Sequence, residues 1–158
     1  MGNYAPSTRA RIADLILGMR VDRATALIGA TQTLFTVSGG RIALLYLLGE
    51  FTAAATEATT LYINCNATGS AVDTVLSVNP GSSLAAAAIE SKLTLPAAVG
   101  STITLSTGQG AAVLNAAPVY VISAGIIQAV IGTGNSTGYV KWSLFYAPID
   151  TGAYVTAG

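Results

Sequence analysis

From residue 31 onward, turn sequences rich in glycine, asparagine and proline divide the chain into short runs of β-branched and aromatic residues. Runs of this composition that recur roughly every 8–12 residues are typical of strands. The predicted strands are residues 31–37, 41–48, 59–64, 71–78, 101–105, 111–115, 119–122, 126–131 and 139–146. Many short strands at this spacing predict an all-β fold, either a sandwich or a barrel.

Three stretches allow a more specific interpretation. Residues 31–37 and 41–48 flank Ser38-Gly39-Gly40, which predicts a hairpin, and the second run is apolar enough to be buried on both faces. Residues 82–90 contain four consecutive alanines and are also compatible with a short helix. In residues 139–146, Trp142, Leu144 and Tyr146 alternate onto one face, which predicts a core stripe more than a sugar-binding platform.

The beginning of the chain has a different composition from the rest. Six of the fourteen charged residues fall within the first 23 positions: Arg9, Arg11, Asp14, Arg20, Asp22 and Arg23. The shift in composition predicts a boundary between residues 24 and 30, with an N-terminal arm at 1–30 and a β-sheet body at 31–158.

The arm has some helical character. Ser7 or Thr8 is a suitable N-cap, and Asp22 could cap a second short turn. Four apolar residues follow the first cap at helical spacing: Ile12, Leu15, Ile16 and Met19. An amphipathic arm of this kind can dock on a neighbouring subunit or pack on its own domain, and the sequence leaves both possibilities open.

The overall composition points to a surface that is covered by another molecule. Hydrophobic residues make up 52% of the chain and charged residues 9%, against about 25% charged in ordinary soluble proteins. The longest strongly apolar run is residues 42–48, which is too short to span a bilayer, so a protein partner is expected and a membrane is not. Four arginines offset by two aspartates make a poor nucleic-acid footprint, and no nucleic-acid partner is expected.

Residues that carry catalysis or hold cofactors are scarce. The chain has no histidine, so Ser-His-Asp and Cys-His arrangements are excluded. Cys65 is the single cysteine; it can form neither an intrachain disulfide nor a cysteine zinc site, and it is predicted to be a small buried hydrophobe. The glycine clusters lack the third glycine of a dinucleotide loop and the lysine of a phosphate loop. We therefore expect no enzyme activity, no catalytic residues, no metal and no cofactor.

Several stretches resemble small structural proteins of tailed-bacteriophage virions, and most of all capsid decoration (cement) proteins. Residues 136–153, STGYVKWSLFYAPIDTGA, resemble a recurring final strand and turn of pattern GxVKWxLxYxPLDxGA. LFTVSGG at 34–40 and GEFT at 49–52 are similar to the LFTVTGG and GEVT segments of that family. Shorter matches are PAAVG at 96–100 and SAGII at 123–127. The sequence departs from the pattern at Ile149, where leucine is usual, and at Ser123, where proline is usual.

The resemblance covers about residues 31–153 and implies a β-sandwich, jelly-roll-like, that is a virion component. The implied function is decoration of the outer surface of the phage head, where the protein would stabilise the capsid lattice through contacts with the major capsid protein. A homo-oligomer, trimer or dimer, is the expected state. Low charge and the amphipathic arm suggest these partner contacts: Arg9, Arg11, Ile12, Leu15 and Ile16. A tail or neck structural protein and a sugar-binding head fibre module are the alternatives.

Overall fold

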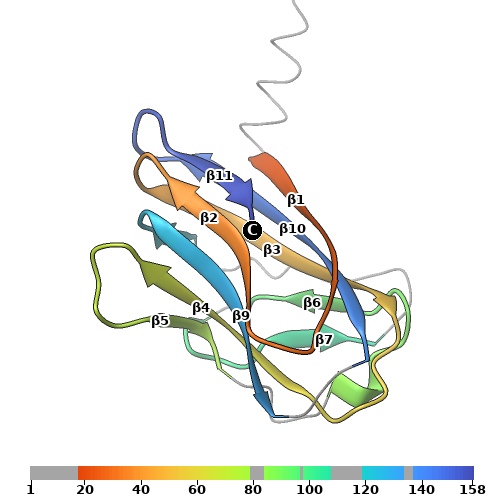
Figure 1. Cartoon of the computed structure of the whole chain (residues 1–158). Coiled ribbons are helices and arrows are strands. Elements are labelled where there is room, and N and C mark those ends of the chain that lie inside the picture. The colour runs from red at the N-terminus through yellow and green to blue at the C-terminus, as the bar shows by residue number, and fades with distance from the viewer. Residues whose placement is uncertain (1–17, 79–83, 97, 108–118, 134–136) are drawn as a thin grey trace, which may run out of the picture.

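The computed structural model describes residues 18–78, 84–96, 98–107, 119–133 and 137–158. These residues form two sheets of antiparallel strands that lie face to face, with the hydrophobic core between them (Figure 1). Within the described residues the helical element is a single 3-10 turn, Leu84–Ala86, which falls in the segment where the sequence allows a short helix. The prediction of an all-β antiparallel sandwich is confirmed.

The first sheet, sheet A, has the strand order β1-β10-β3-β6-β7. Its long strand β3 pairs with β10 over most of its length, while β8 and β6 pair with successive stretches of β3. The strands of sheet A are β1 Met19–Leu27, β3 Ile42–Ala53, β6 Lys92–Thr94, β7 Thr104–Ser106, β8 Tyr120–Ile122 and β10 Tyr139–Pro148.

The second sheet, sheet B, has the strand order β11-β2-β9-β4-β5. Its middle strand β9 pairs with β2 on one side and with β4 on the other. The strands of sheet B are β2 Gln32–Ser38, β4 Thr60–Ala67, β5 Thr74–Ser77, β9 Gly125–Thr133 and β11 Tyr154–Ala157.

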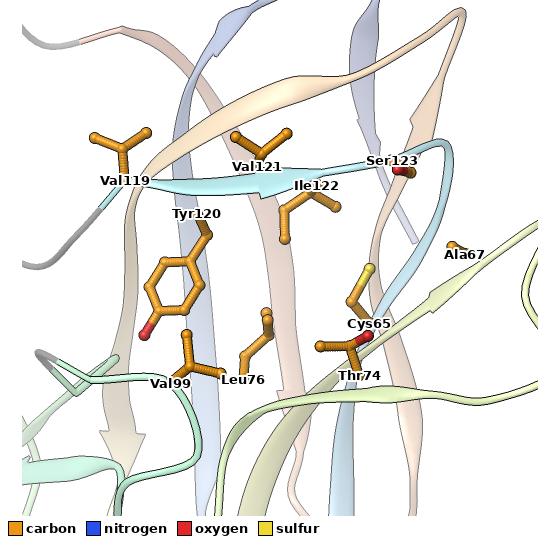
Figure 2. A pocket seen from close by; sticks show the side chains of 10 residues that line it. All are labelled: Cys65, Ala67, Thr74, Leu76, Val99, Val119, Tyr120, Val121, Ile122 and Ser123. Atoms are coloured by element: carbon orange, nitrogen blue, oxygen red, sulfur yellow. The ribbon is translucent and has the colours of Figure 1, made fainter.

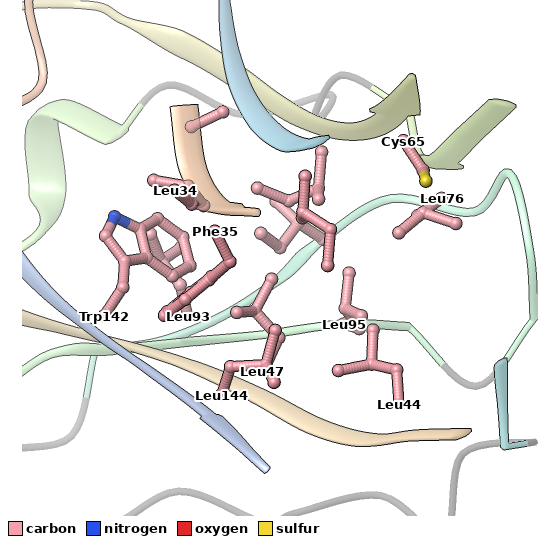
Figure 3. Packing of buried hydrophobic residues seen from close by; sticks show 14 of the residues in the cluster. Leu34, Phe35, Leu44, Leu47, Cys65, Leu76, Leu93, Leu95, Trp142 and Leu144 are labelled. Carbon is pink, nitrogen blue, oxygen red and sulfur yellow. The ribbon is translucent and has the colours of Figure 1, made fainter. Parts of the chain in front are cut away.

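The core is built from the inward-facing residues of both sheets. Trp142, Leu144 and Tyr146 of β10 are each at most 2% exposed, so the predicted core stripe is confirmed. Figure 3 shows Trp142 at one end of the cluster and Cys65 with Leu76 at the other. Cys65 is buried at 6% exposure, as expected for a small hydrophobe.

The predicted hairpin between residues 31–37 and 41–48 is wrong. Strand β2 lies in sheet B and β3 in sheet A, so Ser38-Gly39-Gly40 carries the chain from one sheet to the other. Gly39 and Gly40 have φ values of 74° and 143°, and a Cβ at either position would collide with residues 150–152. Residues 38–40 do form a turn, as predicted, but the turn lies at a corner of the sandwich between the two sheets. The prediction that residues 41–48 are buried on both faces is also wrong, because Leu45 and Tyr46 are half-buried on the outer face.

The segment assigned to the arm contains a strand. Met19 and Asp22, which the sequence placed in helical turns, lie in β1, which pairs with β10 at the edge of sheet A. The physical reason is a period of two: Val21, which packs against the core, and Arg23 are partly buried, whereas Arg20 and Asp22 are exposed. Residues 1–17, which contain the rest of the predicted helix, lie outside the described residues.

The other predicted strands match the structure unevenly. Seven of the nine predicted strands overlap observed ones: β2, β3, β4, β7, β8, β9 and β10. An eighth, residues 71–78, overlaps the shorter strand β5. The predicted strand at 111–115 lies outside the described residues. Strands β1, β6 and β11 were not predicted; β6 and β11 have three and four residues, too few for a clear alternating pattern.

Candidate interaction surfaces

Charged residues are divided unequally between the two sheets. The strands of sheet A contain Arg20, Asp22, Arg23, Glu50, Lys92 and Lys141. The five strands of sheet B contain no lysine, arginine, aspartate or glutamate at all. Asp73, just before β5, brings a carboxylate to the border of sheet B. The sandwich therefore has one outer face whose strands carry charged residues and one whose strands carry none, with the Asp73 carboxylate beside it.

The outer face of sheet A is a network of paired polar groups. Arg20 Nε donates to Asp22 Oδ1 at 2.8 Å, and Ser143 Oγ donates to the same oxygen at 2.6 Å. The hydrogen bond from Ser143 is the main cause that lowers the pKa of Asp22, followed in that direction by Arg20. Arg20 also lies 5.7 Å from the centre of the Phe145 ring. These contacts line a groove of about 110 Å³, where Arg20 pairs with Asp22 and Glu50 pairs with Lys92.

The outer face of sheet B has no such network. We define the uncharged face by its six central residues, which point away from the core: Thr36, Tyr62, Asn64, Ile126, Gln128 and Val130. Their neighbours in the same strands face inward and are buried, among them Phe35, Ile63 and Ile127. The strand register joins the six residues into rows, because Ile126 is opposite Thr36, Gln128 opposite Asn64, and Val130 opposite Tyr62. Apolar and amide side chains thus form one continuous patch.

One polar atom on the uncharged face has no partner among the described residues. Asn64 is 5% exposed, and its Nδ2 donates to Asp73 Oδ2 at 2.7 Å. Its Oδ1 accepts no hydrogen bond. An acceptor that is removed from water without a donor costs about 1–3 kcal/mol, and here the chain itself covers the oxygen.

An apolar pocket of about 330 Å³ lies between the sheets, where β8 faces β4 and β5 (Figure 2). Tyr120 and Ile122 extend from β8 toward Cys65 and Leu76, while Val121, which is 62% exposed, points to the opposite side of the strand. Burial, and to a lesser degree the charge of Asp73, raises the pKa of the Cys65 thiol, so the thiol stays protonated at neutral pH and is a poor nucleophile. Among the described residues, no group of three or more His, Cys, Asp or Glu side chains could hold a metal ion.

The stretches that resemble virion proteins meet at one corner of the sandwich. Arg41 follows the glycine pair 39–40, and its Nε and Nη2 donate to the two carboxylate oxygens of Asp150 at 2.9 and 2.7 Å. The backbone N–H of Arg41 donates to Asp150 Oδ2 at 2.8 Å as well. These bonds fasten the beginning of β3 to the turn between β10 and β11. The residues of the pattern therefore build a structural corner, which sequence reasoning did not foresee because 109 positions separate the partners.

We expect the Arg41–Asp150 contact to make stability depend on pH in the acid range. The hydrogen bonds from Arg41 lower the pKa of Asp150 to about 2, below its ordinary value of 3.8. A carboxyl group with a lowered pKa stabilises the fold above its unfolded pKa, and this contribution is lost as pH falls through the folded pKa. The substitution Asp150→Asn should therefore reduce the free energy of unfolding at pH 6, and the difference from wild type should shrink between pH 4 and pH 2.

Urea unfolding at these pH values measures the effect, and an Arg41→Gln background provides the control. In that background the same Asp150→Asn substitution should change the pH profile less, since the guanidinium and its positive charge are gone and the backbone N–H donor remains. An equal pH dependence in both backgrounds would contradict the assignment.

The five predicted contact residues, Arg9, Arg11, Ile12, Leu15 and Ile16, all lie outside the described residues, and their role stays a prediction. Sequence reasoning missed the uncharged face, although the charge-free composition of residues 60–67 and 125–133 was visible. No helix in the described part of the chain is both long and apolar enough to cross a bilayer. No known protein family, curated protein or solved structure matches this chain.

Proposed function

We propose that this protein is a structural component of a tailed-phage virion that decorates the outer surface of the head. In this function it stabilises the capsid lattice through contacts with the major capsid protein. The observation that carries the proposal is the division of charge between the two sheets. A sandwich with charged strands in one sheet and uncharged strands in the other is suited to standing between a protein surface and solvent.

The composition of the described surface supports a building block. A decoration protein acts by the mass action of many copies, each of which makes contacts that need not be strong individually. Uncharged contacts suit this task because they do not require the burial of unpaired charges. On the outer face of sheet B, Thr36, Ile126 and Val130 are β-branched residues with few side-chain rotamers, so ordering them in an interface costs little entropy.

The resemblance to virion proteins is compatible with such a function. Its best-matched stretch forms β10 and the corner turn, where Trp142 is buried in the core and Asp150 holds Arg41. These residues maintain the fold. A protein whose function is mechanical requires a rigid fold, and the residues of the resemblance maintain one. The resemblance therefore supports a structural function, but not a particular position on the particle.

In the proposed mechanism, the arm reaches across a subunit boundary. Strand β1 begins at Met19 on the edge of sheet A, and Gly18 precedes it with a φ of 75°. The segment upstream thus joins the sandwich at an edge, from which it can extend to a neighbour. Within it, Arg9 and Arg11 would contact polar groups of the capsid protein, and Ile12, Leu15 and Ile16 its apolar surface.

The number of copies per particle tests the proposal. Quantitative mass spectrometry of purified virions should find this chain at a ratio to the major capsid protein on the order of one-to-one or one-to-three, as expected for a lattice component. A few copies per particle would instead indicate the tail or neck. Complete absence from the particle would contradict the virion function.

A further inference from the structure

We propose that the apolar pocket between β8 and strands β4 and β5 binds a small uncharged molecule, with the size and character of a two-ring aromatic alcohol. This inference goes beyond the proposed function and does not depend on it, because it concerns a cavity inside a single copy of the chain. It rests on the volume of the pocket, the side chains that line it and the charge beside it.

The pocket forms where the side chains along one strand become small. Leu61 and Ile63 of β4 face the other sheet and are fully buried in the core. The next two positions on the same side of β4 are Cys65 and Ala67, and both line the pocket. Protein interiors rarely contain voids larger than a water molecule, so a volume of about 330 Å³ is space that the core leaves unfilled.

The volume of the pocket sets the size of its ligand. A dry cavity of about 150 Å³ can hold one benzene molecule, and small-molecule sites begin at about 300 Å³. The pocket, at about 330 Å³, therefore has room for two fused rings. It is also open to solvent, because Thr74 and Val99 in its lining are exposed. A ligand of this size can enter without separation of the two sheets.

The walls of the pocket are mainly hydrocarbon. Figure 2 shows Tyr120 and Ile122 extending from β8 toward Leu76 of β5. Tyr120 Oη donates to the carbonyl oxygen of Pro96 at 3.1 Å, so the hydroxyl of this residue is engaged and its ring forms an apolar wall. Such walls favour a ligand that is largely apolar, because its binding removes apolar surface from water on both sides.

The charge beside the pocket selects against anions. None of the ten residues that line it is charged. Asp73 precedes the lining residue Thr74, and a hydrogen bond from Asn64 Nδ2 to Asp73 Oδ2, at 2.7 Å, holds this carboxylate in place. Its charge acts in the pocket, because it adds to burial, the larger cause, in raising the pKa of the Cys65 thiol. A carboxylate or phosphate is therefore repelled, whereas the hydroxyls of Thr74 and Ser123 can bond one neutral polar group.

Two compounds with the same rings test the class of ligand: 1-naphthalenemethanol, which is neutral, and 1-naphthoate, which is an anion. Isothermal titration calorimetry at neutral pH should give one site per chain for 1-naphthalenemethanol, with a dissociation constant on the order of 100 µM, as expected for about twelve non-hydrogen atoms. The constant for 1-naphthoate should be at least about tenfold higher, because its carboxylate would be buried without a cation. Absence of saturable binding of the neutral compound up to about 1 mM, or binding of 1-naphthoate that is as tight, would overturn the proposal.

Substitutions that fill the pocket test its location. Cys65→Phe and Thr74→Phe each add a ring to the lining, and each should raise the dissociation constant of 1-naphthalenemethanol at least about tenfold. Thr74 is exposed, so its variant should fold even if Cys65→Phe does not, and circular dichroism checks this. Val121→Phe is the matched control, because the Val121 side chain points to the other side of β8, and its constant should stay within about twofold of wild type. Weaker binding only in the control would overturn the proposal.

Cys65 provides a second measurement, because it is the single cysteine of the chain and lines the pocket. Its alkylation by N-ethylmaleimide at mildly alkaline pH can be followed by mass spectrometry. A concentration of 1-naphthalenemethanol ten times its dissociation constant should slow the reaction about tenfold, because only the empty pocket exposes the thiol. An unchanged rate would place the bound molecule elsewhere and overturn the proposal. Neither measurement depends on the number of copies per virion, so this inference and the proposed function can fail separately.

Discussion

Replacing Trp142 by alanine lowers the free energy of unfolding by about 3–5 kcal/mol, the range found for the truncation of buried aromatic residues. Trp142 is 1% exposed and lies on β10, between β1 and β3. Its ring packs directly on Gly49, where an added Cβ would lie 2.8 Å from Trp142 Cζ3. Because β3 offers no side chain at this position that could fill the space, the cavity left by alanine should persist. Urea unfolding at neutral pH measures the loss.

Trp142→Phe is the control that separates volume from hydrogen bonding. The indole Nε1 is buried and has no hydrogen-bond acceptor among the described residues, so phenylalanine removes no bond. We expect this variant to lose less than half as much stability as the alanine variant. A loss as large as that of alanine would show that the indole nitrogen makes a bond that this structure lacks.

The sequence predicted the interior of the sandwich better than its connections. Alternation in residues 139–146 placed Trp142, Leu144 and Tyr146 in the core correctly, because burial on one face of a strand imposes a period of two. The turn at residues 38–40 was recognised, but a turn sequence does not say whether the next strand pairs with the previous one or crosses to the other sheet. Here the ion pair to Asp150, distant in sequence, holds the crossing in place.

The edge strand β1 shows a second limit of sequence reasoning. Arg20, Asp22 and Arg23 made it resemble a polar arm, but charged residues are common on edge strands, where they discourage pairing with other chains. The candidate surface was missed for a related reason. Each strand of sheet B looks like any uncharged strand, and only the strand order shows that β11, β2, β9, β4 and β5 lie side by side and form a charge-free face.

Gly125→Ala is the second substitution for which we expect a large effect, a loss of about 3 kcal/mol or more in the free energy of unfolding. Gly125 begins the middle strand of sheet B with a φ of 153°, which alone costs a side chain about 1–3 kcal/mol. A Cβ there would also collide with the carbonyl oxygen of Asn66 and lie 2.7 Å from the Cα of Ala67. Backbone atoms of a paired strand cannot turn aside as a flexible side chain can, so the overpacking adds a further cost of about 1–3 kcal/mol.

Two other glycines separate these two causes. Gly100 has a φ of 75° with no atom near the position of an added Cβ, and Gly69 has open space and no positive φ. Gly100→Ala should therefore lose about 1 kcal/mol from strain alone, and Gly69→Ala should change stability by less than about 0.5 kcal/mol. Thermal unfolding of the three variants would rank them in this order, with the larger loss at Gly125 assigned to its contact with β4. If Gly125→Ala lost no more than Gly100→Ala, β4 and β9 could separate at this end without cost. In that case the pairing of β4 with β9 would not fix the register that aligns Gln128 with Asn64. The geometry of the uncharged face would then not be fixed either.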